Sequence, residues 1–231
     1  MLFRSLDPVT NQRSLGLLGR DNAHWSFFFN SDASVVEGNR IEDRGEGQSP
    51  RFQTTATVQH YSALDQFLMG LRPASEVPPT FLVRNPSLPI SASSAPQAGR
   101  SFDGTRQDIT VQMIVDAEGR RVPDATVAQK HFNFAFVLLA QEGAQPAAED
   151  LAQIERLRLA WEQFFTAAVD NRGTASTGLV KRLRLSTWPA GGMLSGSPAS
   201  ATVSLASPVN RDLAVQLARV RTGGAGTTAV G

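Results

Sequence analysis

The segment from Glu149 to Asp170 constrains the fold more than any other part of this sequence, because its pattern predicts one long amphipathic helix. Pro146 precedes it and Gly173 follows it, as is usual at the two ends of a helix. Polar residues such as Glu155 and Arg156 fall on one side. Apolar residues recur every three or four positions on the other side: Leu151, Ile154, Leu157, Trp161, Phe164, Phe165 and Ala168. We expect this stripe to be core and the helix to pack on a sheet.

Shorter patterns predict an α+β fold. In Tyr61–Leu71 the apolar residues have helical spacing, and Ser62 with Asp65 fits a capping box. A second helix is expected between Thr110 and Gly119. Strands are expected at Ala23–Phe29, at Phe81–Val83 and, as a central strand, at His131–Ala140. Polar loops are expected at Asn39–Arg51 and Arg84–Arg106.

Charged residues are distributed unevenly, and this predicts a domain boundary. The sequence has 22 Lys and Arg and 21 Asp and Glu, yet the 46 residues from Ser186 onward hold only four of them. We therefore expect one domain over 1–185, a linker over 186–200 and a second module over 201–231. Ala201–Val209 and Asp212–Ala218 resemble two strands with a turn between them, the start of an incomplete β-sandwich.

Composition excludes several classes of protein. The absence of cysteine excludes disulfide scaffolds, cysteine-based zinc sites and cysteine nucleophiles. A net charge of +1 argues against a general nucleic-acid binder. No apolar run is long enough for a membrane span, and no signal peptide is visible after Met1.

Common catalytic motifs are also missing. There is no G-x-S-x-G, no phosphate-binding glycine loop and no H-E-x-x-H. The three histidines, His24, His60 and His131, are too far apart in sequence for two of them to share one helix face. A complete zinc enzyme within these residues is therefore not expected.

Three segments nevertheless resemble a group of secreted bacterial zinc metallopeptidase-like proteins: Leu18–Phe28 (LGRDNAHWSFF), Asp32–Asn39 (DASVVEGN) and Tyr61–Leu71 (YSALDQFLMGL). The resemblance continues to the Trp161 helix and covers about Leu2–Leu185. Ala201–Ala218 similarly looks like the opening strands of the immunoglobulin-like repeats that often follow such domains. The resemblance implies a zincin-like C-terminal subdomain with a truncated immunoglobulin-like repeat attached.

In those proteins an H-E-L-G-H-R-W helix comes shortly before a segment like Leu2–Arg20, and this chain does not contain it. The resemblance implies that the parent protein is secreted and hydrolyses polypeptides with zinc-activated water. We expect this chain to be a fragment that is inactive and binds no zinc tightly by itself.

The resemblance also implies site residues. The third zinc ligand would be either His24 or Asp65. Asp32 and Glu37 would orient a ligand, Met69 would lie under the metal, and Tyr61 would donate a hydrogen bond to a substrate oxyanion.

Simpler roles fit the same residues. His24 is also compatible with a packed histidine bonded to a carbonyl, Asp65 with a capping residue and Met69 with core.

A different class of function remains open. The chain could be a non-catalytic extracellular module that binds polypeptide or glycan through the aromatic His24–Phe29 segment and the Arg84–Arg106 loop. A purely structural protein is a third hypothesis. Neither predicts a metal.

Overall fold

The computed structural model describes residues 4–8, 10–140 and 143–178, and the backbone of four short strands further along the chain. Helices and sheets are both present, which confirms the α+β class. The chain divides into two compact units, called here the N-terminal unit (Met1–Lys130 with Phe165–Gly173) and the second unit (His131–Phe164 with Thr174–Gly231). The predicted linker lies outside the described residues. Within the described ranges, no helix combines the length and apolar character needed to cross a membrane.

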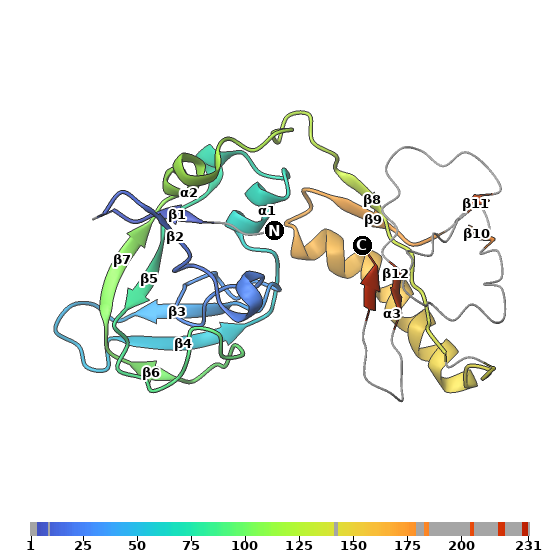
Figure 1. Cartoon of the computed structure of the whole chain (residues 1–231), viewed down its shortest axis with the longest axis horizontal. Helices are drawn as coiled ribbons and strands as arrows, with labels where there is room; N and C mark the ends of the chain where they lie inside the picture. The colour runs from blue at the N-terminus through green and yellow to red at the C-terminus, as the bar shows by residue number, and fades with distance from the viewer. Residues whose placement is uncertain are drawn as a thin grey trace. The chain divides into compact units, whose positions relative to one another are not determined.

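Two antiparallel sheets make up most of the N-terminal unit (Figure 1). In the first, β4 (Phe52–Thr57) lies between β3 (Asn39–Asp43) and β6 (Ser101–Phe102). In the second, β5 (Thr80–Arg84) pairs with β7 (Thr105–Ile109). β5 therefore confirms the strand predicted at Phe81–Val83.

The β3–β4 hairpin corrects the prediction of a polar loop over Asn39–Arg51, because only residues 44–51 form the connection. Asn39 and Ile41 are buried and Glu42 is exposed, the alternation of a strand with one face on the core. Asn39 conceals this alternation in the sequence. Its amide is satisfied inside the core, where it donates to the carbonyl of Phe27 at 2.9 Å.

Aromatic side chains dominate the core of the N-terminal unit. The largest fully buried ones are Phe27, Phe29, Phe52, Phe102 and Phe165. The strand predicted at Ala23–Phe29 is wrong, since this segment forms only isolated bridges, from Trp25 to Leu18 and from Phe29 to Leu82. Its side chains pack inward without a regular ladder.

Helix α1 (Ala63–Leu68) begins as predicted. Ser62 and Asp65 form a capping box in which each side chain bonds the backbone N–H of the other residue. Residues 165–173 join the N-terminal unit beside this helix. The Tyr61 N–H donates to the carbonyl of Ala168 at 2.8 Å, and Gln66 donates to Asp170 at 2.8 Å.

Helix α2 (Val111–Glu118) also has the predicted bounds, with Thr110 as its N-cap and Gly119 at its end. It packs beside β1 (Ser5–Leu6), which pairs with β2 (Arg13–Ser14). Two single-turn 3₁₀ helices complete the unit, η1 (Arg20–Asn22) and η2 (Ala74–Glu76).

The second unit contains a β–α–β arrangement. β8 (His131–Asn133) and β9 (Thr174–Ser176) are parallel, and α3 (Ala148–Ala168) connects them in sequence. The predicted long helix is confirmed. The central strand predicted at His131–Ala140 is wrong beyond β8, because its partner β9 has only three residues.

The apolar stripe of α3 is core only in part. Phe165 is buried, whereas Phe164 is 41% exposed. Trp161 is half-buried and its ring lies 5.3 Å from that of Phe134.

Further along, β10 (Leu183–Arg184) pairs with β11 (Ser204–Leu205), and β12 (Leu217–Arg219) pairs with β13 (Thr228–Val230). β11 overlaps the strand predicted at 201–209, and β12 overlaps the strand predicted at 212–218. They do not pair with each other, because β11 pairs with β10 and β12 pairs with β13. The predicted turn between them lies outside the described residues.

Candidate functional site

His24 lies in a tight turn of the N-terminal unit, and its side chain is 29% exposed. Its Nδ1 is 3.1 Å from the carbonyl oxygen of Arg20. Because a carbonyl only accepts, we assign a ring proton to Nδ1. Nε2 lies 3.9 Å from Oε1 of Glu37, a distance that suits an ion pair when both ring nitrogens carry protons. One predicted ligand therefore turns its second ring nitrogen toward a predicted orienting carboxylate.

Glu37 is fixed from its other side by Arg20, whose guanidinium also contacts Oε1. The two segments that carry this pair have an unusual backbone. Five non-glycine residues have φ between 50° and 55°: Asp21, Asn22, Asp32, Ala33 and Glu37. Such left-handed conformations are costly for residues with a Cβ and persist only where surrounding contacts impose them.

Asp65 has a different environment from His24, because its carboxylate is inside the protein and only 4% exposed. Oδ1 accepts the indole N–H of Trp25 at 2.9 Å. Oδ2 accepts the backbone N–H of Ser62 at 2.7 Å and its hydroxyl at 2.9 Å. Burial raises the pKa of Asp65 more than the hydrogen bonds from Ser34, Trp25 and Ser62 lower it.

The Tyr61 phenol interacts electrostatically with the Asp65 carboxylate. Burial raises the pKa of the Tyr61 phenol, and the charge of Asp65 raises it further. Its ring packs edge-on against Phe165, with 6.0 Å between centroids. Met69 is half-buried and serves as the C-cap of α1.

Asp32 is oriented away from the His24 pair and bonds to a second histidine. Nε2 of His60 lies 2.7 Å from the Asp32 carbonyl oxygen and 3.2 Å from Oδ2. Arg40 donates to Oδ1 at 2.6 Å. Residues 32–37 thus carry two histidine–carboxylate–arginine groups, one at each end.

Trp25 links the two candidate ligands, because it follows His24 in the sequence and its indole donates to Asp65. Both oxygens of Asp65 accept hydrogen bonds, and Nε2 of His24 lies 3.9 Å from Oε1 of Glu37.

Zinc sites in proteins use three or four side-chain ligands. Among the described residues, no three His, Asp or Glu side chains come together as a set that could hold a metal ion. His24 and Glu37 supply two donors at most. They fit part of a zinc site and not a whole one.

Sequence reasoning missed Arg20, His60 and Ser34. Arg20 lies within Leu18–Phe28 and Ser34 within Asp32–Asn39, two segments that carry the family resemblance. Their position in these segments was the available signal. His60 gave none, because its contact with Asp32 depends on the bridge between Ser34 and His60.

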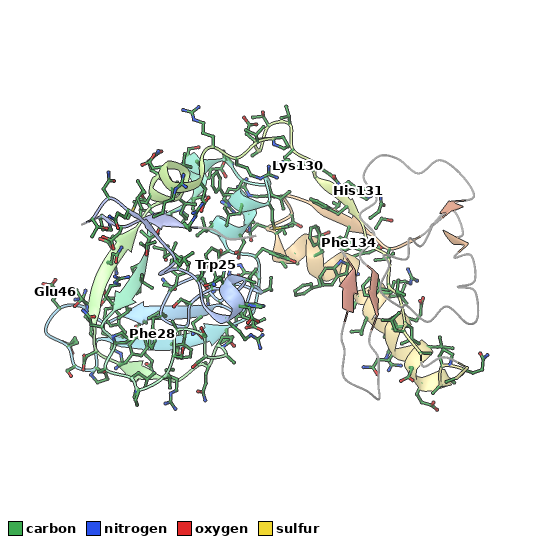
Figure 2. The ribbon with its side chains drawn as sticks, in the orientation of Figure 1. Trp25, Phe28, Glu46, Lys130, His131 and Phe134 are labelled. Carbon is green, nitrogen blue, oxygen red and sulfur yellow. The ribbon has the colours of Figure 1, made fainter. Side chains whose placement is uncertain are left out.

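The His24–Phe29 segment does not present the aromatic surface that the binding-module hypothesis requires. Trp25 and all three phenylalanines of 27–29 are buried. The Arg84–Arg106 loop packs on the core through Leu88, Ile90 and Ala92. Figure 2 shows Trp25 and Phe28 among the crowded side chains of the N-terminal unit, whereas Glu46 lies at the tip of the β3–β4 connection. The aromatic residues that suggested ligand binding are therefore structural.

The chain was compared with models of known protein families, with curated proteins and with solved structures, and none of the three comparisons finds a match.

Proposed function

We propose that this chain is part of a zinc-dependent peptidase, in which His24 contributes an imidazole ligand to the metal. The observation that carries this proposal is the orientation of His24, with Nδ1–H bonded to the Arg20 carbonyl and Nε2 turned toward Glu37. Histidines that bind metals commonly donate their other N–H to a carbonyl or carboxylate, which fixes the ring and its tautomer. The sequence resemblance described above supports the same assignment.

Zinc, when bound in such a site, activates a water molecule for attack on a peptide carbonyl. The chain's own residues would act around it. Glu37, held by Arg20, orients the His24 ring or accepts a proton. Tyr61 is a phenol that holds its proton at neutral pH, and burial raises its pKa further, so it can donate a hydrogen bond to an oxyanion.

The remaining ligands would come from a helix with an H-E-x-x-H sequence outside this chain. The described residues alone fit only part of a site. We therefore propose that this chain by itself is inactive, that the parent acts on polypeptides outside the cell, and that its fold is zincin-like.

The test begins with the coding DNA directly before the Met1 codon, which should contain an in-frame H-E-x-x-H. The protein that includes this segment should hold one zinc per chain by elemental analysis and should cleave an unstructured protein such as casein. His24→Ala should lose most of the zinc and the cleavage. The matched control, His60→Ala, should keep both.

Two results would overturn the proposal. One is the absence of any H-E-x-x-H segment upstream. The other is full zinc content in His24→Ala, which would assign the ligand elsewhere.

A further inference from the structure

We propose that Asp65 is the positioning residue of this site: from inside the core, it holds in place the two segments that present His24 and Glu37. The site it positions is that of the proposed function. The role itself is a property of the folded chain and is measurable without metal.

Asp65 accepts hydrogen bonds from two segments that are far apart in the sequence: from the indole of Trp25, and from both the N–H and the hydroxyl of Ser62. Trp25 and Ser62 are themselves buried. One carboxylate thus bonds groups that are up to 37 residues apart in sequence.

Backbone hydrogen bonds connect these donors to the surface pair of His24 and Glu37. Trp25 follows His24, and its backbone N–H donates to the carbonyl of Val36 at 3.1 Å, next to Glu37. The hydroxyl of Ser34 accepts the N–H of Val36 at 3.0 Å. His24 therefore precedes a residue that bonds Asp65 directly, and Glu37 follows Val36, which is joined to Asp65 through Trp25.

The donors around Asp65 require a carboxylate rather than an amide. An ionised carboxylate is acceptor-only, with room for about four hydrogen bonds. An amide would place an NH₂ group against either the indole N–H of Trp25 or the N–H of Ser62, and two donors would then face each other. Asp65→Asn keeps the shape of the side chain but cannot satisfy all its donors.

The experiment uses the full chain without metal and two site-resolved readouts of His24. The first is its tautomer, from the ring nitrogens in ¹⁵N NMR, assigned with His24→Ala. The second is the rate at which diethyl pyrocarbonate modifies His24, measured by mass spectrometry with His131 as the internal reference.

In the wild type, His24 should be the Nδ1–H tautomer. In Asp65→Asn we expect a mixture of tautomers and a several-fold change in the modification rate of His24, with His131 unchanged. Trp25→Phe, which removes the indole donor and keeps an aromatic ring, should have the same effect. It keeps the proposal testable if Asp65→Asn does not fold.

Thr110→Ala is the matched control, because it removes the N-cap of α2 rather than that of α1 and should leave His24 at wild-type values. The proposal is wrong if Asp65→Asn and Trp25→Phe lower stability but leave the tautomer and rate of His24 unchanged, since Asp65 would then be only a helix cap. It is equally wrong if Thr110→Ala alters His24 as much. A failure to find zinc in the longer protein changes neither readout, so the two proposals can fail separately.

Discussion

Asp43 and Asp65 are both largely buried, but different partners hold them. Arg51 binds Asp43 through two bonds of 2.7 and 2.8 Å, and Arg106 adds a third contact at 3.0 Å. The hydrogen bond from Arg51 is the main reason that the pKa of Asp43 lies far below its usual range. Neutral donors surround Asp65, and its pKa is raised. The same residue type should therefore respond to pH in opposite directions.

For Asp65, the folded pKa lies above the unfolded value, so its contribution to stability is full below the unfolded pKa and is lost as the pH rises through the folded pKa. The free energy of unfolding of the wild type, measured relative to Asp65→Asn, should increase as the pH falls from 7 toward 4. Urea denaturation of both proteins at several pH values measures this difference. A difference that is flat with pH would contradict the raised pKa.

For Asp43, the folded pKa lies below the unfolded value, so its contribution is present above the unfolded pKa and is lost as the pH falls through the folded one. Asp43→Asn should lose about 2 kcal/mol of unfolding free energy at pH 7, the range of hydrogen bonds to charged groups. The same titration should show this loss shrinking toward pH 3. A loss that grows on acidification would show that Arg51 is not the cause.

The sequence predicted part of the candidate site correctly at the level of single residues. Polar contacts are made by four of the predicted side chains, those of His24, Asp32, Glu37 and Asp65. The sequence did not predict the partner of each side chain. Asp32 bonds His60 rather than His24, because the backbone pairing at Ser34 decides which histidine comes close.

At the level of elements, prediction succeeded where a local rule determines the outcome. The capping box at Ser62 and the N-cap at Thr110 placed α1 and α2 correctly, because a helix end is decided by neighbours in sequence. Strands depend on partners far along the chain. β3 was missed because its buried Asn39 breaks the apolar alternation, and β8 was overextended because nothing in its sequence reveals how short β9 is.

The turn that carries His24 depends on a glycine. A Cβ on Gly19 would lie 2.5 Å from the carbonyl oxygen of Trp25 and 2.8 Å from that of Ala92. Both are backbone atoms and cannot rotate away. Gly19→Ala should cost about 2–3 kcal/mol of unfolding free energy, as overpacking does.

Gly178→Ala is the matched control for Gly19→Ala, since none of the described residues places an atom within 4 Å of its Cβ position. Thermal melting of the two variants beside the wild type measures the effect. Equal melting temperatures for both variants would mean that the turn yields to the added methyl group.

At the level of the whole molecule, the N-terminal unit draws on two separate parts of the sequence. It includes residues 165–173, because Phe165 and Val169 are buried in it and Asp170 bonds Gln66 and Arg72. Contacts between residues about 100 positions apart leave no trace in local composition.

Neighbouring phenylalanines of α3 should therefore have very different effects. Phe165→Ala removes a ring that is 2% exposed and should destabilise the N-terminal unit by about 3–5 kcal/mol. Phe164→Ala removes one that is 41% exposed and should cost less than about 1 kcal/mol. Hydrogen exchange of the β5 amides reports on this unit specifically. Similar protection of β5 in both variants would place Phe165 outside its core.

The segment between Ser31 and Asn39 is tied to its neighbours at both ends and in the middle. The N–H of Ser31 reaches the carbonyl of Asn39, Val35 reaches His60, and Trp25 reaches Val36. An inserted or deleted residue would shift every one of these pairings. Insertions and deletions within this segment should therefore destabilise the fold. The connection over 44–51, whose Gly45 and Gly47 have open space around them, can accept longer or shorter versions.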